Sequence, residues 1–176
     1  MNLEALQRMI REIKDFPKPG ILYKDVTPLL ARSDIRHFIA TETTERLKGT
    51  KVDAIAGIEA RGFLFGVTLA DYLCVPFIPI RKAGKLPYKT IQESYELEYG
   101  SAQLEIHTDA VVPGQHILIY DDLLATGGTL AAAGKLIKRL NGDVAGFCCI
   151  IWLSSLDGAI RLKNEFGHFP NYLIRY

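Results

Sequence analysis

Residues 116–137 read "HILIYDDLLATGGTLAAAGKLI", and this stretch decides the predicted fold. An apolar run ends in two adjacent aspartates, Asp121 and Asp122, and a helix-like pattern follows a glycine-containing turn. The pattern predicts a buried strand over 116–120 and a helix over 129–140. In an open α/β sheet, ligands bind beyond the carboxyl ends of the strands. The turn between these two elements is therefore a candidate binding site.

The turn has the composition of a phosphate-binding loop. In "ATGGT", Ala125 and Thr126 precede Gly127 and Gly128, whose flexibility lets backbone N–H groups converge on an anion. Thr126 and Thr129 add hydroxyl donors, and Thr129 opens a helix whose N-terminus carries partial positive charge. The stretch has neither the Lys-Ser/Thr of a Walker A loop nor the GxGxxG of a dinucleotide fingerprint. A plain strand-to-helix turn is the alternative interpretation.

Two carboxylates beside such a loop would repel a bare phosphate. Asp121 and Asp122 are explained if the phosphate belongs to a sugar, because carboxylates accept hydrogen bonds from vicinal ribose hydroxyls. Their negative charge would also favour a ribosyl transition state that develops positive charge. The alternatives are that the two aspartates only cap or solvate the turn, or that they hold a metal directly.

The composition is that of one domain without a strongly charged surface. The chain has 176 residues, of which 48% are hydrophobic and 23% are charged, and its net charge is +1. These values are typical of a soluble globular domain and disfavour a nucleic-acid or anionic-membrane partner. We find no signal-peptide core and no apolar run of about 18 residues. Cys74, Cys148 and Cys149 lie in apolar runs and fit reduced core thiols, which favours a cytoplasmic protein.

Outside this stretch, strands alternate with helices along the chain. The order predicts an α/β fold with a mostly parallel central sheet and helices on both of its faces. Pro76 and Pro79 place their strand near an edge or an end of the sheet. The predicted helices cover 2–14, a segment that begins at Ser33 and Asp34, and 61–73; the predicted strands cover 52–58, 75–80, 144–153 and 171–176; 81–94 is an exposed loop, and "YELEYG" and "AQLEIH" form a hairpin.

Several segments together resemble one family. "ILIYDDLLATGGT" resembles the phosphoribosyl-pyrophosphate signature of the type I phosphoribosyltransferases, in the form found in the adenine-specific enzymes. "FPKPGILYKDVTPLL", "GIEARGFLFG", "IRKAGKLP" and "YELEYG" match the same enzymes in the same order, so the resemblance covers nearly the whole chain. It implies a single phosphoribosyltransferase domain over 1–176, with an N-terminal hood at approximately 1–32 and a flexible lid and hairpin at 81–107.

The resemblance implies that "GIEARG" binds pyrophosphate. Glu59 and Ala60 occupy the position where the family has a non-proline cis peptide, and the family often has aspartate where Glu59 stands. Arg61 would then meet the pyrophosphate, because a guanidinium fork suits phosphate oxygens. Without the family, Arg61 fits a surface residue at the start of a helix.

The lid and its hairpin would complete the site. The resemblance implies that Arg81, Lys82 and Lys85 face the pyrophosphate, although the segment by itself fits a solvated basic loop. Glu98 matches the family's candidate general acid or base near N7 of the purine, and Tyr99 follows it. From its alternating pattern alone, Glu98 would be an exposed strand residue.

The resemblance assigns recognition of the base to the hood. It implies adenine contacts for Leu22, Tyr23 and Lys24, with Tyr23 offering a ring face for stacking. Leu156 would cover the other face of the purine. The family often has Phe-Arg where Tyr23 and Lys24 stand. Leu22 and Leu156 by themselves fit plain core or hood residues.

The implied reaction transfers the ribosyl group of 5-phosphoribosyl 1-pyrophosphate to adenine, giving AMP and pyrophosphate. Mg²⁺, chelated mainly by the substrate's own oxygens and by water, would be the cofactor. The family is typically dimeric, so a homodimer is expected. Two alternatives stay open. The same chemistry could act on xanthine, hypoxanthine or guanine, with Lys24 or another lysine donating to O6. A regulator of this fold could instead bind a nucleotide or nucleic acid without catalysis.

Overall fold

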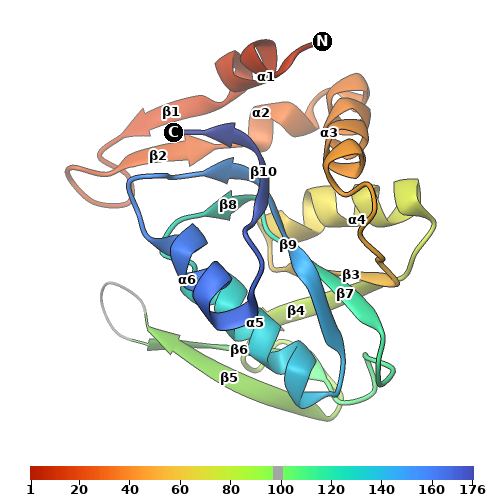
Figure 1. Cartoon of the computed structure of the whole chain (residues 1–176). Helices are drawn as coiled ribbons and strands as arrows, with labels where there is room; N and C mark the ends of the chain where they lie inside the picture. The colour runs from red at the N-terminus through yellow and green to blue at the C-terminus, as the bar shows by residue number, and fades with distance from the viewer. Residues whose placement is uncertain (97–100) are drawn as a thin grey trace.

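The computed structural model describes residues 1–96 and 101–176, and it places a central sheet between two layers of helices (Figure 1). The helices are α1 (Leu3–Met9), α2 (Thr27–Leu30), α3 (Ser33–Arg46), α4 (Arg61–Leu73), α5 (Gly128–Arg139) and α6 (Gly158–Phe166). The strands are β1 (Arg11–Lys14), β2 (Leu22–Asp25), β3 (Ala54–Ile58), β4 (Phe77–Lys82), β5 (Thr90–Glu96), β6 (Ser101–His107), β7 (His116–Tyr120), β8 (Leu123–Leu124), β9 (Asp143–Trp152) and β10 (Asn171–Arg175).

The large sheet is mostly parallel. Its strand order is β10-β9-β7-β3-β4-β6-β5, and β8 pairs with β9. Neighbours from β10 to β4 run parallel, whereas β6 runs antiparallel to β4 and to β5. The predicted α/β fold is therefore confirmed. A separate antiparallel pair, β1 and β2, lies close to the C-terminal end of the chain (Figure 1).

The central strands send alternate side chains into two cores. Ala56, Ile58 and Ile119 are buried with residues of α5 and α6 on one face of the sheet. Ile55 and Leu118 are buried with residues of α3 and α4 on the other face. An alternation of this kind, with both positions apolar, is what a strand covered on both faces requires.

The strand order reverses at the neighbouring strands β3 and β7, where Gly57 lies opposite Tyr120. From β3 the chain passes through α4 to β4 on one side of this pair. From β7 it passes through α5 to β9 on the other side. Open α/β sheets bind ligands at such a switch point, beyond the carboxyl ends of the strands. The fold thus places the loops after Ile58 and after Tyr120 at the expected location of a site.

The helix predicted over 2–14 is wrong beyond Met9. Ile10 takes an extended conformation and ends α1. β1 then pairs with β2, with Ile13 opposite Tyr23. Leu6 and Ile10 are both buried in the same core. The apolar spacing therefore marks burial correctly, but pairing with β2 overrides the helical interpretation.

Three further expectations are corrected. β5 begins at Thr90, inside the segment predicted as an exposed loop, and α6 was not predicted. β4 lies inside the sheet order, not at its edge. Pro79 pairs with β3, whereas the pairs of β4 with β6 involve Arg81 and Lys82. Pro76 precedes β4, and Pro79 occupies the part of β4 where the ladder to β6 does not require its missing N–H group.

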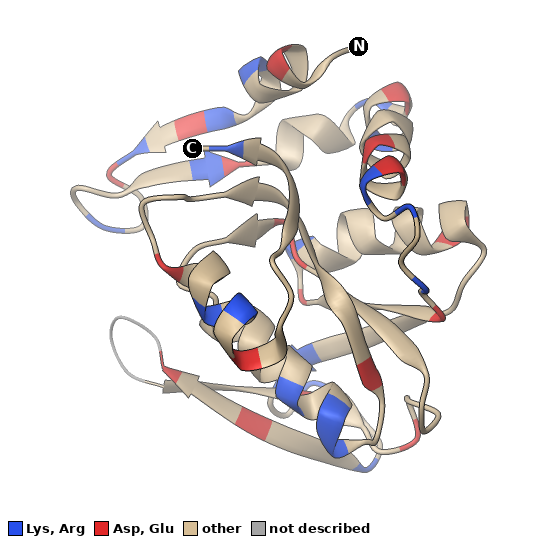
Figure 2. Ribbon diagram, viewed as in Figure 1, with Lys and Arg blue, Asp and Glu red and all other residues tan. Residues whose placement is uncertain are grey.

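Charged residues of both signs are distributed along the whole ribbon (Figure 2). Among the described helices, none has the length and apolar character needed to span a membrane. All three cysteines are free, and Cys148 and Cys149 are buried as predicted. Cys74 is exposed, because it ends α4 in a left-handed conformation at the surface.

Candidate active site

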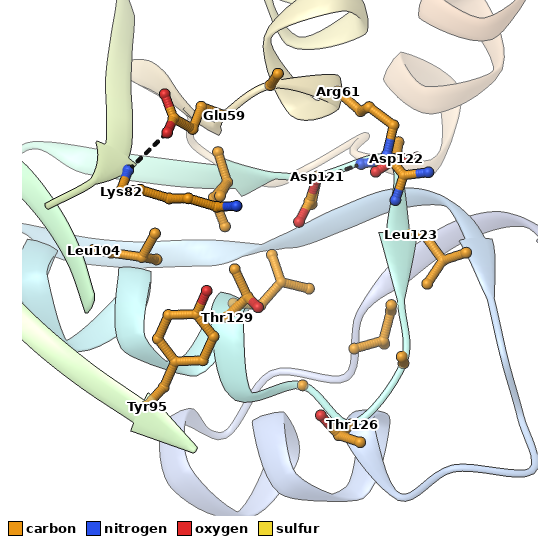
Figure 3. Close-up of a pocket in the computed structure, with 16 residues that line it drawn as sticks. Glu59, Arg61, Lys82, Tyr95, Leu104, Asp121, Asp122, Leu123, Thr126 and Thr129 are labelled. Atoms are coloured by element: carbon orange, nitrogen blue, oxygen red, sulfur yellow. Dashed lines mark hydrogen bonds and ion pairs between the residues drawn. The ribbon is translucent and has the colours of Figure 1, made fainter. Parts of the chain in front are cut away.

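A pocket of about 270 Å³ lies at the switch point of the sheet (Figure 3). The loops after β3 and after β7 form most of its wall, and β4, β5 and β6 contribute single residues. Its lining residues are Ile58, Glu59, Ala60, Arg61, Lys82, Tyr95, Leu104, Asp121, Asp122, Leu123, Leu124, Ala125, Thr126, Gly127, Thr129 and Leu130. Ten of the residues assigned to substrate from the sequence therefore come together there.

The loop from Ala125 to Thr129 presents the start of α5 to the pocket. Gly127 is the N-cap of α5 with a φ of 77°, and no side chain caps the helix. The first N–H groups of a helix have no partner within it, so they are free to bind an anion and carry partial positive charge. Gly128, the first residue of α5, is buried behind the loop and does not line the pocket. The geometry is that of a phosphate-binding helix start.

Gly158, at the start of α6, supports this loop from behind. A Cβ at Gly158 would lie 2.1 Å from the carbonyl oxygen of Ala125 and 2.8 Å from the backbone nitrogen of Gly127. Only glycine permits so close an approach. Gly158 is not among the residues predicted from the sequence, because nothing local in "LSSLDG" indicates contact with a loop about thirty residues earlier.

The two aspartates differ in their surroundings. Figure 3 shows the Asp121 carboxylate pointing into the pocket and Asp122 turned toward Arg61. Asp122 is 2% exposed, and its Oδ2 lies 3.1 Å from Nε of Arg61. The backbone N–H of Asp122 also donates to Oδ1 of Asp121 at 2.9 Å. Asp121 is thus available to a ligand, while Asp122 holds Arg61 in place.

Burial dominates the electrostatics of this pair. It raises the pKa of Asp121 well above the ordinary value, and the charge of Asp122 raises it further. Burial also raises the pKa of Asp122, while the Arg61 guanidinium opposes that shift. A desolvated carboxylate is stabilised by hydrogen-bond donors. Two sugar hydroxyls donating into this site would supply them.

Arg61 connects the pocket to the N-terminal strands. Its guanidinium forms a short hydrogen bond with the Tyr23 hydroxyl and lies 5.2 Å from the centre of the Tyr23 ring. Leu22 is 44% exposed, and Leu156 is half-buried. Leu22, Tyr23 and Leu156 do not line the pocket described above.

The side chain of Lys24 points away from the pocket. Lys24 is 6% exposed, forms an ion pair with Glu12, and has its Nζ 3.6 Å from the centre of the Tyr176 ring. These contacts join β1, β2 and the last residue of the chain. The structure therefore gives Lys24 a packing role that differs from the base contact expected for it.

The Glu59 carboxylate contacts the protein itself. It accepts hydrogen bonds from Nε of Arg81 at 2.6 Å and from the backbone N–H of Lys82 at 3.1 Å. Burial raises the pKa of Glu59, but the Arg81 hydrogen bond and the Lys82 N–H outweigh burial and hold the pKa below its ordinary value. The peptide between Glu59 and Ala60 is cis, as the family resemblance implies. Through its hydrogen bond with the backbone N–H, Glu59 fixes the position of Lys82, whose side chain lines the pocket.

A second carboxylate, Glu105 of β6, fixes the segment that follows. Glu105 is 2% exposed and accepts hydrogen bonds from the backbone N–H groups of Lys85 and Leu86, both at 2.8 Å. The carbonyl oxygen of Lys85 accepts a hydrogen bond from Arg81. Arg81 and Lys85 therefore shape the segment beside the pocket, and neither lines it.

Glu98 and Tyr99, the proposed acid or base and its neighbour, lie outside the described residues. Tyr95 lines the pocket and is not among the site residues predicted from the sequence. Its position on alternating strand β5 was the signal available, since it shares a face with Ile91 and Glu93. The alternation does not indicate that this face of β5 packs against α5, because that contact depends on the tertiary fold.

The fold and the pocket together are those of an α/β domain with a helix start suited to a phosphate-bearing ligand at the switch point of its sheet. A family model described as "Phosphoribosyl transferase domain" matches residues 26–166. An adenine phosphoribosyltransferase of Escherichia coli O157:H7 is 51% identical over 164 residues, covering 93% of this chain and 90% of that protein. The chain belongs to the adenine phosphoribosyltransferase family of phosphoribosyltransferases.

Solved structures agree with this assignment. The crystal structure of adenine phosphoribosyltransferase from Thermoanaerobacter pseudethanolicus has a TM-score of 0.95 and 48% identity, and the match covers 99% of this chain and all of that one. The Saccharomyces cerevisiae enzyme, complexed with an imino-altritol bisphosphate and adenine, has a TM-score of 0.89 and 35% identity, with 98% of each chain covered.

Proposed function

We propose that this protein transfers the 5-phosphoribosyl group of 5-phosphoribosyl 1-pyrophosphate to N9 of adenine, releasing pyrophosphate and forming AMP. One observation carries the proposal. A helix start suited to a phosphate, a carboxylate suited to ribose hydroxyls, and two cations suited to pyrophosphate share one pocket. The adenine phosphoribosyltransferase relatives supply the identity of the base.

Each part of the pocket has a task in this reaction. The loop from Ala125 to Thr129 holds the 5′-phosphate, and Asp121 accepts hydrogen bonds from the ribose hydroxyls. Arg61 and Lys82 contact the leaving pyrophosphate, with Arg61 oriented by Asp122. Positioning and electrostatic stabilisation supply most of the acceleration in such a reaction.

The adenine end of the site is less enclosed by the described residues. Leu22, Tyr23 and Leu156 are the proposed contacts of the base. Glu98 is proposed to accept a proton from the imidazole ring of adenine, since a ring proton must leave when N9 forms its bond to the ribosyl carbon and pyrophosphate departs. General acid–base assistance of this type is worth about 10²–10⁴-fold.

Magnesium fits the pocket as a partner of the substrate. Within residues 1–96 and 101–176, no three histidine, cysteine or carboxylate side chains gather as a ready metal site. The oxygen atoms of Asp121 are suitable ligands for a hard cation that keeps much of its water. When bound, magnesium would neutralise charge on the pyrophosphate. The chain's own residues orient the sugar and the leaving group.

The geometry of Lys24 supports adenine over a 6-oxopurine. A site for hypoxanthine, xanthine or guanine needs a donor to O6. Lys24 was the candidate in the hood, and its ammonium is engaged by Glu12 and the Tyr176 ring. An adenine site instead offers an acceptor to the amino group, which an oxo group would leave unpaired.

Pyrophosphate release tests the proposal. The protein is incubated with magnesium, 5-phosphoribosyl 1-pyrophosphate and, in turn, adenine, hypoxanthine, guanine, xanthine and uracil. We expect kcat/KM for adenine to exceed the others by at least about a hundredfold. Asp121→Asn, which keeps the shape of the side chain, serves as the matched site variant. A comparable kcat/KM for guanine would reject adenine as the substrate, and no release with any base would reject the reaction.

We also propose a homodimer that uses the outer face of α4. Leu64, Val67 and Tyr72 are 42%, 43% and 47% exposed on this helix, which is unusual for large apolar side chains grouped on one element. Sedimentation at micromolar concentration should show a dimer, and Val67→Glu should shift it toward monomer. A wild-type protein that sediments only as a monomer would reject this proposal.

A cytoplasmic location is proposed on the state of the thiols. The adjacent, buried Cys148 and Cys149 are both free. Burial raises the pKa of Cys148 to about 12, so this thiol is protonated and unreactive at neutral pH. Unpaired thiols are typical of a reducing compartment.

A further inference from the structure

One face of β5 lies along α5, the helix that begins at the phosphate loop. The exposures of the strand alternate, with Ile91, Glu93 and Tyr95 half-buried and the residues between them exposed. Ile91 and Tyr95 pack against the core that contains the apolar residues of α5. The inward face of β5 therefore carries Ile91, Glu93 and Tyr95 in that order, and Tyr95 is the one of the three that lines the pocket.

Tyr95 reaches the part of the pocket where α5 begins. It lines the pocket together with Thr129. Its ring carbon Cδ2 lies 3.6 Å from the position that a Cβ on Gly128 would take, so the ring sits beside the first residue of α5. Figure 3 shows the phenol oxygen directed into the pocket near Thr129. Among the described residues, this hydroxyl has no hydrogen-bond partner, which leaves its proton available to a ligand.

We propose that Tyr95 is a substrate-binding residue, whose hydroxyl donates a hydrogen bond to the phosphate of a sugar monophosphate held at the start of α5. The inference rests on the proposed function, which makes ribose 5-phosphate the relevant half of the donor substrate. A phenol is a good donor to a charged phosphate oxygen. Its ring also closes the side of the pocket next to Gly128 and excludes water from the N–H groups of the helix start.

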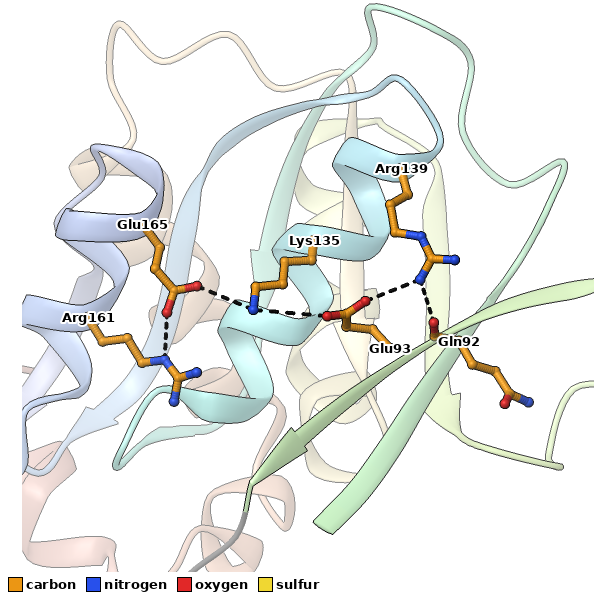
Figure 4. Close-up of polar contacts among 6 residues, drawn as sticks. All are labelled: Gln92, Glu93, Lys135, Arg139, Arg161 and Glu165. Atoms are coloured by element: carbon orange, nitrogen blue, oxygen red, sulfur yellow. Dashed lines mark hydrogen bonds and ion pairs between the residues drawn. The ribbon is translucent and has the colours of Figure 1, made fainter.

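Glu93 positions Tyr95 through ion pairs with α5. Its carboxylate lies 3.2 Å from Nη1 of Arg139 and 4.0 Å from Nζ of Lys135, and Arg139 also donates to the carbonyl oxygen of Gln92 (Figure 4). Lys135 continues the network to Glu165 of α6, at 3.8 Å. These ion pairs hold β5 against α5 at Glu93, two residues before Tyr95. This fixes the register that brings the phenol to the helix start.

Ligand binding by Tyr95→Phe tests the inference, since this change removes only the hydroxyl. Calorimetry with ribose 5-phosphate and with pyrophosphate, both with magnesium, separates the two ends of the pocket. We expect affinity for ribose 5-phosphate to fall about tenfold, the scale of one hydrogen bond to a charged group, and affinity for pyrophosphate to stay unchanged. Tyr88→Phe is the matched control, because Tyr88 is 58% exposed and does not line the pocket.

Unchanged ribose 5-phosphate affinity in Tyr95→Phe would overturn the inference, and so would an equal loss for both ligands. Wild-type turnover of adenine decides the proposed function separately. An active wild type with an unaffected Tyr95→Phe variant rejects the inference alone, whereas a wild type that neither turns over adenine nor binds ribose 5-phosphate rejects both.

A double-mutant cycle tests the role of Glu93. Glu93→Gln should weaken ribose 5-phosphate binding by about threefold or more, and in the Tyr95→Phe background it should add almost nothing, because both changes remove the same contact. Glu45→Gln, which breaks an exposed ion pair between Glu45 of α3 and Lys48, is the control for loss of a glutamate charge. Additive losses from Glu93→Gln and Tyr95→Phe would show that Glu93 does not act through Tyr95.

Discussion

Replacement of Gly158 by alanine tests whether α6 sets the geometry of the phosphate loop. The new Cβ would lie 2.1 Å from the Ala125 carbonyl oxygen and 2.8 Å from the Gly127 nitrogen, whereas real Cβ atoms essentially never approach below 3.0 Å. Both near atoms belong to the backbone, so no side chain can rotate to relieve the contact. Loop and helix must therefore separate by about 1 Å at the position proposed for the phosphate.

The size of the effect follows from hydrogen-bond geometry. An N–H to oxygen bond of about 2.9 Å that lengthens by about 1 Å is lost. A hydrogen bond to a charged group contributes about 1.5–3 kcal/mol, and every 1.4 kcal/mol is tenfold in affinity. One lost bond predicts a decrease of about ten- to a hundredfold in affinity for ribose 5-phosphate. Overpacking costs about 1–3 kcal/mol of stability, which the better helix propensity of alanine offsets by only about 1 kcal/mol.

Calorimetry with ribose 5-phosphate, together with urea unfolding, measures the two effects independently. Gly66→Ala is the matched control, because its Cβ would meet a Phe77 ring atom at 3.0 Å and no atom of the phosphate loop. That variant should lose stability and keep its affinity. A folded Gly158→Ala variant that binds ribose 5-phosphate within about threefold of wild type would refute the reasoning, since the loop would then tolerate displacement.

Three further changes address other parts of the site. Gly127→Val should lower affinity for 5-phosphoribosyl 1-pyrophosphate by about tenfold or more in calorimetry, because the residue has a φ of 77° and its Cβ would lie 2.9 Å from the Gly158 carbonyl oxygen. Glu98→Gln should reduce the single-turnover rate by about 10²–10⁴-fold with that affinity unchanged; a rate within about threefold of wild type would exclude the proton-transfer role. Burial raises the pKa of Glu105, but backbone N–H donors hold it below the ordinary 4.5, so its stabilisation is present above that pH and is lost as pH falls through the lowered value. Glu105→Gln should therefore be less stable than wild type in urea at pH 7, with a gap that narrows as pH falls below 4.5; a gap independent of pH would contradict this.

The sequence predicted those elements whose pattern has a single interpretation. The helix over 61–73 and the strand over 116–120 have the observed bounds, because each combines one clear period with a defined end. The N-terminal segment failed since Leu6 and Ile10 are four residues apart, a spacing that a helix and a helix-to-strand transition both satisfy. The choice is made by pairing with β2, whose residues lie about 8 to 14 positions further along the chain than their partners in β1.

The phosphate loop was predictable for a local reason, and its supports were not. Composition and a place after a buried strand identify the turn from Ala125 to Thr129. Gly158 and Tyr95 touch the same turn from α6 and β5, and such contacts depend on the packing of segments about thirty residues apart in sequence. For Lys24, a local motif was misleading. The family resemblance implied a contact with the base, but the Lys24 side chain packs against the Tyr176 ring.

The arrangement of charges explains why two carboxylates, Asp121 and Asp122, can lie next to a loop suited to a phosphate. Two cations and three carboxylates line the pocket, and Arg81 neutralises Glu59 from behind. Asp122 is paired with Arg61, so Asp121 is the carboxylate of this pair that faces the pocket. The formal charges nearly balance, and net positive charge therefore cannot be what attracts a polyanionic substrate. In the proposed reaction, the oriented N–H groups at the start of α5 and a divalent cation carried by the substrate would supply the attraction, and the Asp121 carboxylate would be free to recognise the sugar.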